Sequence, residues 1–169
     1  VCEKMIGDRE FRTPFLKQTD LFISGREGYH TYRIPAMVVS TEGTILAFCE
    51  GRKYSGADYG DIDIVLKRSF DNGETWEPLQ VIADDGSNTM GNPSPVVDRD
   101  TGTILLLLCK NNIQVYLMKS TDDGATWSSP LEITKDVKRD DWYWYATGPC
   151  HGIQLKNGRL VIPCDHQEG

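Results

Sequence analysis

Two turns with the same residue pattern constrain the fold of this 169-residue chain most strongly. Residues 69–76 and 120–127 both read Ser-x-Asp-x-Gly-x-Thr-Trp, and they begin 51 residues apart. A period of this length is typical of repeat proteins, in which each unit buries its apolar face against a neighbour. In each turn we expect the aspartate to accept hydrogen bonds from backbone N–H groups two residues on, and the glycine to adopt positive φ. The tryptophan is expected to fold back as an apolar plug.

Apolar segments with the length and alternation of β-strands recur around both turns. Two strands joined by a hairpin turn come first, a third leads into the tryptophan turn, and a fourth follows it. The expected strands are residues 34–39, 43–49, 63–68 and 79–82 in the first unit, and 93–97, 102–109, 114–119 and 131–134 in the second. Each unit is therefore a four-stranded antiparallel meander of roughly 50 residues, which describes one blade of a β-propeller.

The predicted fold class is all-β, a β-propeller of four-stranded antiparallel blades. Helices should be few, because no long stretch keeps the apolar spacing of a helix. A closed propeller has 4–8 blades and this chain supplies about three, so we expect the leading part of a longer domain. The expected units are a lead-in over about 1–20, a first blade over about 21–85, a second over about 86–135 and the start of a third over about 136–169.

Composition excludes several classes of function. The net charge of −7 and the pI near 4.9 are the opposite of the basic face that nucleic-acid binding requires. No apolar run approaches the ~20 residues of a membrane span, and the first residues do not read as a signal peptide. No cysteine or histidine spacing indicates zinc, so no metal and no cofactor are expected. Cys49, Cys109 and Cys164 recur at the same place in successive repeats, which predicts buried apolar side chains in separate blades.

Two arginines are expected at the same end of the first blade. Arg33 opens the strand that we expect to be innermost, where a guanidinium is costly unless it meets an anion, and its planar fork suits a carboxylate. Arg52 ends the next strand, in Glu50-Gly51-Arg52. Two interpretations remain open: the two guanidinium groups bind an anionic ligand together, or they pair with acids of the fold such as Glu50.

The loop over residues 53–63 joins two strands at the Arg33 end and contains three acids, Asp58, Asp61 and Asp63. Loops on a rigid scaffold often carry function. The carboxyl group of Asp58, in a segment able to close over a ligand, suits a general acid and base. Asp61 and Asp63 alternate with isoleucines, which is ordinary strand patterning. A solvated acidic loop without function is the alternative.

Taken in order, these motifs resemble the exo-sialidases (neuraminidases), which are six-bladed β-propellers. The resemblance covers about residues 21–169 and rests on the order and spacing of Tyr-Arg-Ile-Pro, Glu-Gly-Arg, the aspartate loop and the repeated turns. It implies that Arg33 belongs to an arginine triad that grips the sialic acid carboxylate, and that Arg52 lines the same end of the site. It also implies that Asp58 is the acid/base catalyst, with Asp61 as the second possibility if the loop register differs.

Two further segments resemble the family. Met90 and Asn92 match the stretch that closes over the substituents of the sugar ring, including the N-acyl pocket, although an ordinary strand start is the alternative. Residues 142–152 resemble the Gly-Pro-Gly-His-Gly segment that leads into the third blade, with Cys150 where glycine is commoner. Its aromatic residues are expected partly in the core and partly beside the glycerol tail. His166 ends the next strand and either contacts substrate or lies on a polar rim.

The resemblance implies hydrolysis of terminal α-linked sialic acids with retention of configuration. The expected partners are sialylated glycoproteins, glycolipids and oligosaccharides, and a secreted or periplasmic location is favoured. Sialidases use a tyrosine nucleophile, because a neutral phenol avoids bringing a second carboxylate to an anomeric carbon that already bears one. In the family this tyrosine, its glutamate and the other two arginines lie in later blades, so we expect this chain to be inactive by itself.

Two other functions fit the same residues. A non-catalytic carbohydrate-binding or interaction propeller would contain the same turns, because these turns are structural. A glycosidase on the same scaffold would act on a different sugar. The geometry of Arg33, Arg52 and Asp58 discriminates: the enzymatic interpretation requires all three side chains in one place at the same end of the blades.

Overall fold

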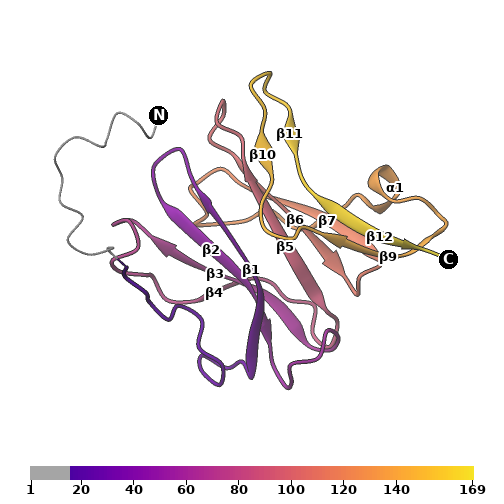
Figure 1. The fold of residues 1–169 in the computed structure, drawn as a ribbon, viewed down its shortest axis with the longest axis horizontal. Helices are drawn as coiled ribbons and strands as arrows, with labels where there is room; N and C mark the ends of the chain where they lie inside the picture. The colour runs from indigo at the N-terminus through magenta and orange to yellow at the C-terminus, as the bar shows by residue number, and fades with distance from the viewer. Residues whose placement is uncertain (1–15) are drawn as a thin grey trace.

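The computed structural model describes residues 16–169, so the first residues and most of the expected lead-in lie outside the described part. Two four-stranded antiparallel sheets form the body of the structure (Figure 1). The first sheet contains β1 (Thr31–Val39), β2 (Ile45–Arg52), β3 (Ile62–Ser69) and β4 (Gln80–Ala83), and the second contains β5 (Met90–Val97), β6 (Ile104–Lys110), β7 (Gln114–Ser120) and β8 (Leu131–Glu132). In both sheets each strand pairs with its neighbour in sequence. The predicted all-β class and the four-stranded meanders are confirmed.

The third unit is built differently along its length. Its first strand is interrupted, so that β9 (Trp142–Thr147) pairs with β12 (Cys164–Glu168), and β10 (Ile153–Gln154) pairs with β11 (Leu160–Val161). One short helix, α1 (Thr134–Val137), begins at the last residue of the fourth strand expected in the second unit. None of the helices within residues 16–169 combines the length and apolarity needed to cross a membrane.

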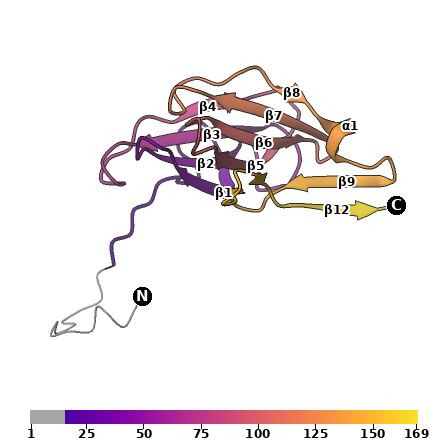
Figure 2. The same cartoon turned by 90° about the horizontal axis from the view of Figure 1, so that it is seen from above.

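The main core lies between the two large sheets. Leu46, Phe48 and Ile64 of the first sheet are fully buried against residues such as Leu106 and Leu108 of the second. Figure 2 shows β1 and β5 along one side of the molecule and β4 and β8 along the other. The two sheets are therefore stacked with the same inner-to-outer order, as successive blades of a propeller are. The chain is a partial propeller.

The two tryptophan turns have the same hydrogen bonds. The Asp71 carboxylate accepts from the backbone N–H of Thr75 at 2.8 Å and from its hydroxyl at 2.6 Å. In the second turn, Asp122 accepts from the corresponding groups of Thr126 at 2.9 and 2.5 Å. The bonds thus reach four residues on, whereas two were expected. The glycines adopt positive φ as predicted. Trp127 packs edge-on against Phe48, at 5.8 Å between ring centroids, so the second turn helps to join the sheets.

These turns make a prediction about acid titration. Hydrogen bonds from Thr75 and Thr126 to the ionised carboxylates lower the pKa of Asp71 and of Asp122 to about 2. Because each folded pKa lies below the ~3.9 of an unperturbed aspartate, the turns stabilise the fold above that pH. This contribution is lost as the pH falls through the folded value. Carboxyl NMR titration should give midpoints near pH 2 for both residues.

The matched variant is Thr75→Val, which removes one hydroxyl donor. It should raise the pKa of Asp71 and leave that of Asp122 unchanged. Equal midpoints near 4 for both aspartates in the unmodified chain would contradict the hydrogen-bonding pattern.

The cysteines correct one expectation. All four cysteines among the described residues are free thiols, and Cys49, Cys109 and Cys164 do lie in different sheets. Their places are not equivalent, however, and Cys164 is exposed. Strand pairing sets Cys109 opposite Gly91, while the position opposite Arg33 in the first sheet belongs to Glu50. Glu50, and not Cys49, is therefore the counterpart of Cys109.

Candidate functional site

An irregularity in β1 sets the direction of the Arg33 side chain. The pairing of β1 with β2 shifts between Arg33 and Ala36, and Ile34 between them has a φ of 55°. A positive φ is a genuine outlier for a β-branched residue, and such strain persists where the surrounding structure enforces it, commonly at functional sites. A bulge of this kind re-aims the neighbouring side chain. The Arg33 side chain is 45% exposed, so its guanidinium is open to solvent.

Asp58 brings the two arginines together. Its Oδ1 accepts a hydrogen bond from Arg33 Nη1 at 2.6 Å and one from Arg52 Nη1 at 2.8 Å. The Asp58 side chain is 73% exposed. Arg33, Arg52 and Asp58 thus meet at one end of the first blade, which is the arrangement that the enzymatic interpretation required. Their roles toward a ligand stay predictions.

Arg52 lies behind this cluster. Its side chain is 3% exposed, and its Nε and Nη2 donate to Glu50 Oε2 at 3.0 and 2.6 Å. Arg52 Nη1 also donates to the backbone carbonyls of Gly56 and Ala57, both at 2.7 Å. Arg52 therefore fixes the tip of the loop that carries Asp58. In this arrangement Arg33 is the arginine of the pair that faces solvent, and direct substrate contact by Arg52 stays a prediction.

Glu50 connects the site to the second sheet. It is 3% exposed, and its Oε1 accepts a hydrogen bond from the backbone N–H of Asn92 at 2.9 Å. A Cβ atom on Gly91 would lie 2.7 Å from the same oxygen, so a larger residue there would push the Glu50 carboxylate out of its place. Asn92 repeats the irregularity of β1, with a φ of 58° directly before Pro93. The carboxylate of Glu50 thus locks two neighbouring blades at the level of Arg52.

The electrostatics of the cluster are balanced. Two guanidinium groups, Arg33 and Arg52, face two carboxylates, Glu50 and Asp58. The hydrogen bond from Arg52, opposed by partial burial and supported by the charge of Arg33, holds the pKa of Asp58 below its usual value. Asp58 is therefore ionised at neutral pH while no ligand is bound. A general acid must carry a proton before it can donate one. Ionised Asp58 therefore corresponds to the resting state of the site, before substrate binds.

The remaining predicted site residues are placed differently. Asn92 lies beside Glu50, but Met90 is 4% exposed and packs in the main core, which does not favour contact with a ligand. Asp61 pairs with Lys53, with 2.8 Å between Oδ1 and Nζ. His166 stacks on Trp142 with 3.7 Å between ring centroids, so its described contacts do not include the arginine cluster. The roles of these residues stay predictions.

Two residues at the site were not anticipated from the sequence. Thr89 is 4% exposed and exchanges hydrogen bonds of 3.0 Å with the backbone N–H and carbonyl of Gly60, which holds the second half of the loop. Lys53 pairs with acids at the base of the same loop. The equivalence of Glu50 and Cys109 was visible in the sequence, because each lies the same number of residues after its turn glycine, Gly43 or Gly102. No comparable signal exists for Thr89.

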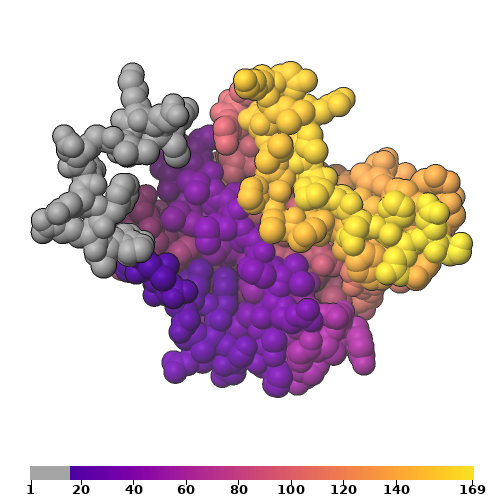
Figure 3. All heavy atoms as spheres, in the orientation of Figure 1, coloured from indigo at the N-terminus to yellow at the C-terminus, as the bar shows by residue number. Residues whose placement is uncertain are grey.

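An apolar cleft lies elsewhere on the first two sheets. It has a volume of about 990 Å³ and is lined mainly by apolar residues of β1 and β5 and by residues 150–154. Figure 3 shows the face on which the purple first sheet meets the yellow β10–β11 segment. Because Arg33, Arg52 and Asp58 are not among the lining residues, the charged cluster and the apolar cleft are separate features. The lining of the cleft is mainly apolar and includes Arg99 and His151.

Comparison with known proteins gives a consistent result. Residues 43–169 match the family described as BNR repeat-like domain. The chain is 40% identical to the exo-alpha-sialidase of Aspergillus fumigatus and 39% identical to that of Arthroderma benhamiae, in each case over 90% of this chain and 45% of the relative. Among solved structures, the Hadza microbial sialidase Hz136 superposes with a TM-score of 0.80 at 32% identity, covering 86% of this chain and 34% of that one. The chain thus spans a little under half the length of the curated relatives named here.

Proposed function

The chain belongs to the BNR repeat-like domain family and is a relative of the exo-sialidases, and from this premise we propose that it supplies part of an exo-α-sialidase active site. In this proposal Arg33 binds the carboxylate of a terminal sialic acid and Asp58 is the general acid and base. The observation that carries the proposal is that Asp58 shares one carboxylate oxygen between Arg33 and Arg52, at 2.6 and 2.8 Å. Sialylated glycoproteins, glycolipids and oligosaccharides are the proposed substrates.

Binding begins as an exchange of carboxylates. Asp58 occupies the exposed guanidinium of Arg33 in the free protein, and the carboxylate of the incoming sugar takes its place. Arginine suits this role because its planar fork makes two parallel hydrogen bonds to one carboxylate. The exchange orients the sugar and places its anomeric carbon relative to the catalytic groups.

The same exchange prepares Asp58 for catalysis. The site is balanced in the free protein, so the substrate carboxylate adds one negative charge beside Glu50 and Asp58. Asp58 then loses part of its contact with Arg33, and a like charge approaches. Both changes raise its pKa and favour uptake of a proton. Protonated Asp58 can donate to the glycosidic oxygen of the leaving group and later accept a proton from the attacking water.

Retention of configuration follows if a nucleophile forms a covalent intermediate. Sialidases use a tyrosine for this step, and a phenol is suited to it because it approaches the anionic sugar without a second negative charge. We propose that the tyrosine, its activating glutamate and two further arginines come from blades that these 169 residues do not include. The chain by itself should therefore give background turnover.

The test is a chimera in which residues 21–169 replace the corresponding segment of the Aspergillus fumigatus exo-alpha-sialidase. The chimera should hydrolyse a fluorogenic sialoside, and the 169-residue chain alone should not. Arg33→Ala in the chimera should lower kcat/KM by about 30-fold or more, which is the effect of removing one partner of a charge pair that the bound substrate buries. Arg139→Ala is the control, because Arg139 is exposed and its ion pair within residues 16–169 is with its near neighbour Asp141.

Each outcome selects among the candidate functions. Robust turnover by the chain alone would refute the need for further blades. A chimera that binds a sialylated glycan but does not cleave it would favour a carbohydrate-binding propeller. If Arg33→Ala leaves binding of a sialic acid analogue unchanged, the scaffold acts on a different sugar.

A further inference from the structure

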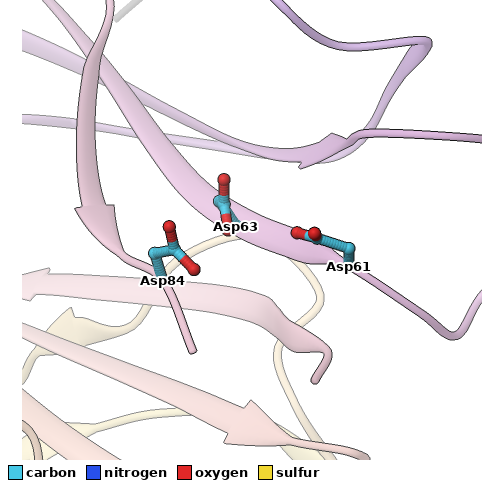
Figure 4. Close-up of side chains that lie close together, drawn as sticks. All are labelled: Asp61, Asp63 and Asp84. Atoms are coloured by element: carbon cyan, nitrogen blue, oxygen red, sulfur yellow. The ribbon is translucent and has the colours of Figure 1, made fainter. Parts of the chain in front are cut away.

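The loop that carries Asp58 has a second charge cluster at its base. Asp61, Asp63 and Asp84 each offer a carboxylate oxygen within 4.8 Å of the others, and this is the group of acids among residues 16–169 with the spacing of a cation site. Figure 4 shows the three carboxylates gathered beside the start of β3 and the segment that follows β4. Three carboxylates so close together repel one another unless a cation lies between them.

That cation is already part of the chain. The ammonium nitrogen of Lys53 lies 2.8 Å from Asp61 Oδ1, 3.2 Å from Asp63 Oδ2 and 3.6 Å from Asp84 Oδ2. These contacts raise the pKa of Lys53, the bond to Asp61 most of all, so the ammonium keeps its charge. Lys53 therefore occupies the place that a metal ion takes in other carboxylate clusters.

The cluster is rigid on the side of the sheet. Asp63 is 1% exposed, and its Oδ2 also accepts a hydrogen bond from the hydroxyl of buried Tyr29 at 2.7 Å. Burial raises the pKa of Asp63, and the bonds from Tyr29 and Lys53 oppose that rise. The bonds from Tyr29 and Lys53 thus favour the ionised form of Asp63 against the effect of its burial.

Lys53 and its neighbour Arg52 hold the loop at different points. Arg52 is the last residue of β2 and Lys53 follows it. Arg52 binds the loop tip at Gly56–Asp58, while Lys53 binds its base at Asp61. The backbone N–H of Lys53 also donates to the carbonyl of Asp61 at 3.1 Å, which closes the loop. The two ends of the loop are therefore joined by a backbone bond and by an ion pair.

We propose that Lys53 is a positioning residue for Asp58. Its ammonium group takes the place of a metal ion and holds the loop over residues 53–61 closed. The structural part of this proposal stands on the contacts above, and its catalytic consequence rests on the proposed function. Removal of the ammonium should open the loop base, because the three acids then repel one another and release Asp61. Asp58 would lose its fixed place beside Arg33.

The first measurement is amide hydrogen exchange in the full 169-residue chain. Lys53→Met keeps the length of the side chain and removes its charge. It should speed exchange of the Gly60 amide and of the residue 53 amide by about 10- to 100-fold, the range for loss of a hydrogen bond to a charged group. Lys53→Arg should restore most of the protection. Lys67→Met is the control, because Lys67 lies on the same sheet and pairs with Glu27, away from the loop.

The second measurement separates charge from packing. In Lys53→Met the three carboxylates are left without their ammonium, so millimolar CaCl₂ should bind there and slow the loop exchange again, since Ca²⁺ prefers carboxylate oxygens. CaCl₂ should not change the loop in the unmodified chain. If Lys53→Met does not fold, Asp61→Asn, which leaves the lysine in place, should show the faster exchange. Unchanged loop exchange in both variants, or a loss in Lys53→Arg equal to that in Lys53→Met, overturns the proposal.

Kinetics in the chimera distinguish this proposal from the proposed function. Lys53→Met should lower kcat by up to about 100-fold, the effect of a displacement near 1 Å at a catalytic group. KM should change less, because Arg33 on β1 is not held by Lys53. An active chimera that tolerates Lys53→Met refutes the positioning role and leaves the sialidase proposal intact. An inactive chimera whose loop exchange still depends on Lys53 does the reverse.

Discussion

Asp58→Asn in the chimera is expected to lower hydrolysis of an unactivated sialylated glycan by about 10²- to 10⁴-fold, the contribution typical of a positioned general acid. Asparagine keeps the shape of the side chain but cannot give a proton to the leaving oxygen. The loss should be much smaller for a substrate with an acidic phenol leaving group, because such a group departs without protonation. The comparison of kcat/KM for the two substrates measures this directly.

The same variant should bind sialic acid more tightly. In the free protein Asp58 competes with the substrate for Arg33, through the 2.6 Å contact to Nη1. Asparagine carries no charge and is a weaker competitor, so the dissociation constant should fall while turnover falls. Asp136→Asn, on helix α1, is the control and should change neither quantity. Wild-type cleavage of the unactivated glycan by Asp58→Asn would exclude Asp58 as the catalyst.

Glu50→Gln is expected to destabilise the chain by about 3–5 kcal/mol, the cost of breaking a buried ion pair and leaving one charge uncompensated. Glu50 and Arg52 are 3% and 2% exposed, and the carboxylate binds both Nε and Nη2 of the arginine. A loss of this size is a large share of the ~5–15 kcal/mol that stabilises a typical domain. Urea unfolding of the unmodified chain and of Glu50→Gln measures this difference in the free energy of unfolding, provided that the two proteins have the same m-value.

Two comparisons give this prediction its controls. Glu77→Gln removes the partner of Arg68 in an ion pair that is half open to water, and such a pair contributes ~0–1 kcal/mol. The double variant Glu50→Met with Arg52→Met removes both charges, so it should be more stable than either single change. A single Glu50→Gln variant as stable as the Glu77→Gln control would show that the buried pair does not hold the two blades together.

Much of the scaffold could be predicted because repetition is visible along the chain. The recurring turns at Asp71 and Asp122 and the alternating apolar residues between them predicted four-stranded units, and both sheets confirm them. The expected fourth strand over residues 131–134 is shorter than predicted, because only Leu131–Glu132 pair, and the four-residue helix α1 begins at Thr134. A helix this short shows no apolar periodicity in the sequence. The hydrogen bonds in the turns were expected two residues on and reach four, across a turn in which Asn72 and Gly73 both have positive φ.

The site could be predicted in part. Arg33, Arg52 and Asp58 were expected at one end of a blade, and they lie there. The place of Met90 in the main core could not be predicted, because it depends on how the second sheet packs against the first. Lys53 was one charged residue among several in a polar loop. Nothing in its local sequence shows that three acids, one of them beyond β4, meet its ammonium group.

By itself, the sequence determined the repeat, the strand order within each unit and the end of the blade at which the charged residues gather. These properties depend on periodicity and on neighbours along the chain, which a single sequence displays. Only the tertiary structure decided that Glu50 pairs with the buried Arg52, that Asp58 accepts a hydrogen bond from Arg33, and that Lys53 closes the loop through Asp61. Which carboxylate pairs with which arginine or lysine depends on where the side chains of the bulged strand β1 and of the closed loop point. Those directions are fixed when the two sheets pack against each other.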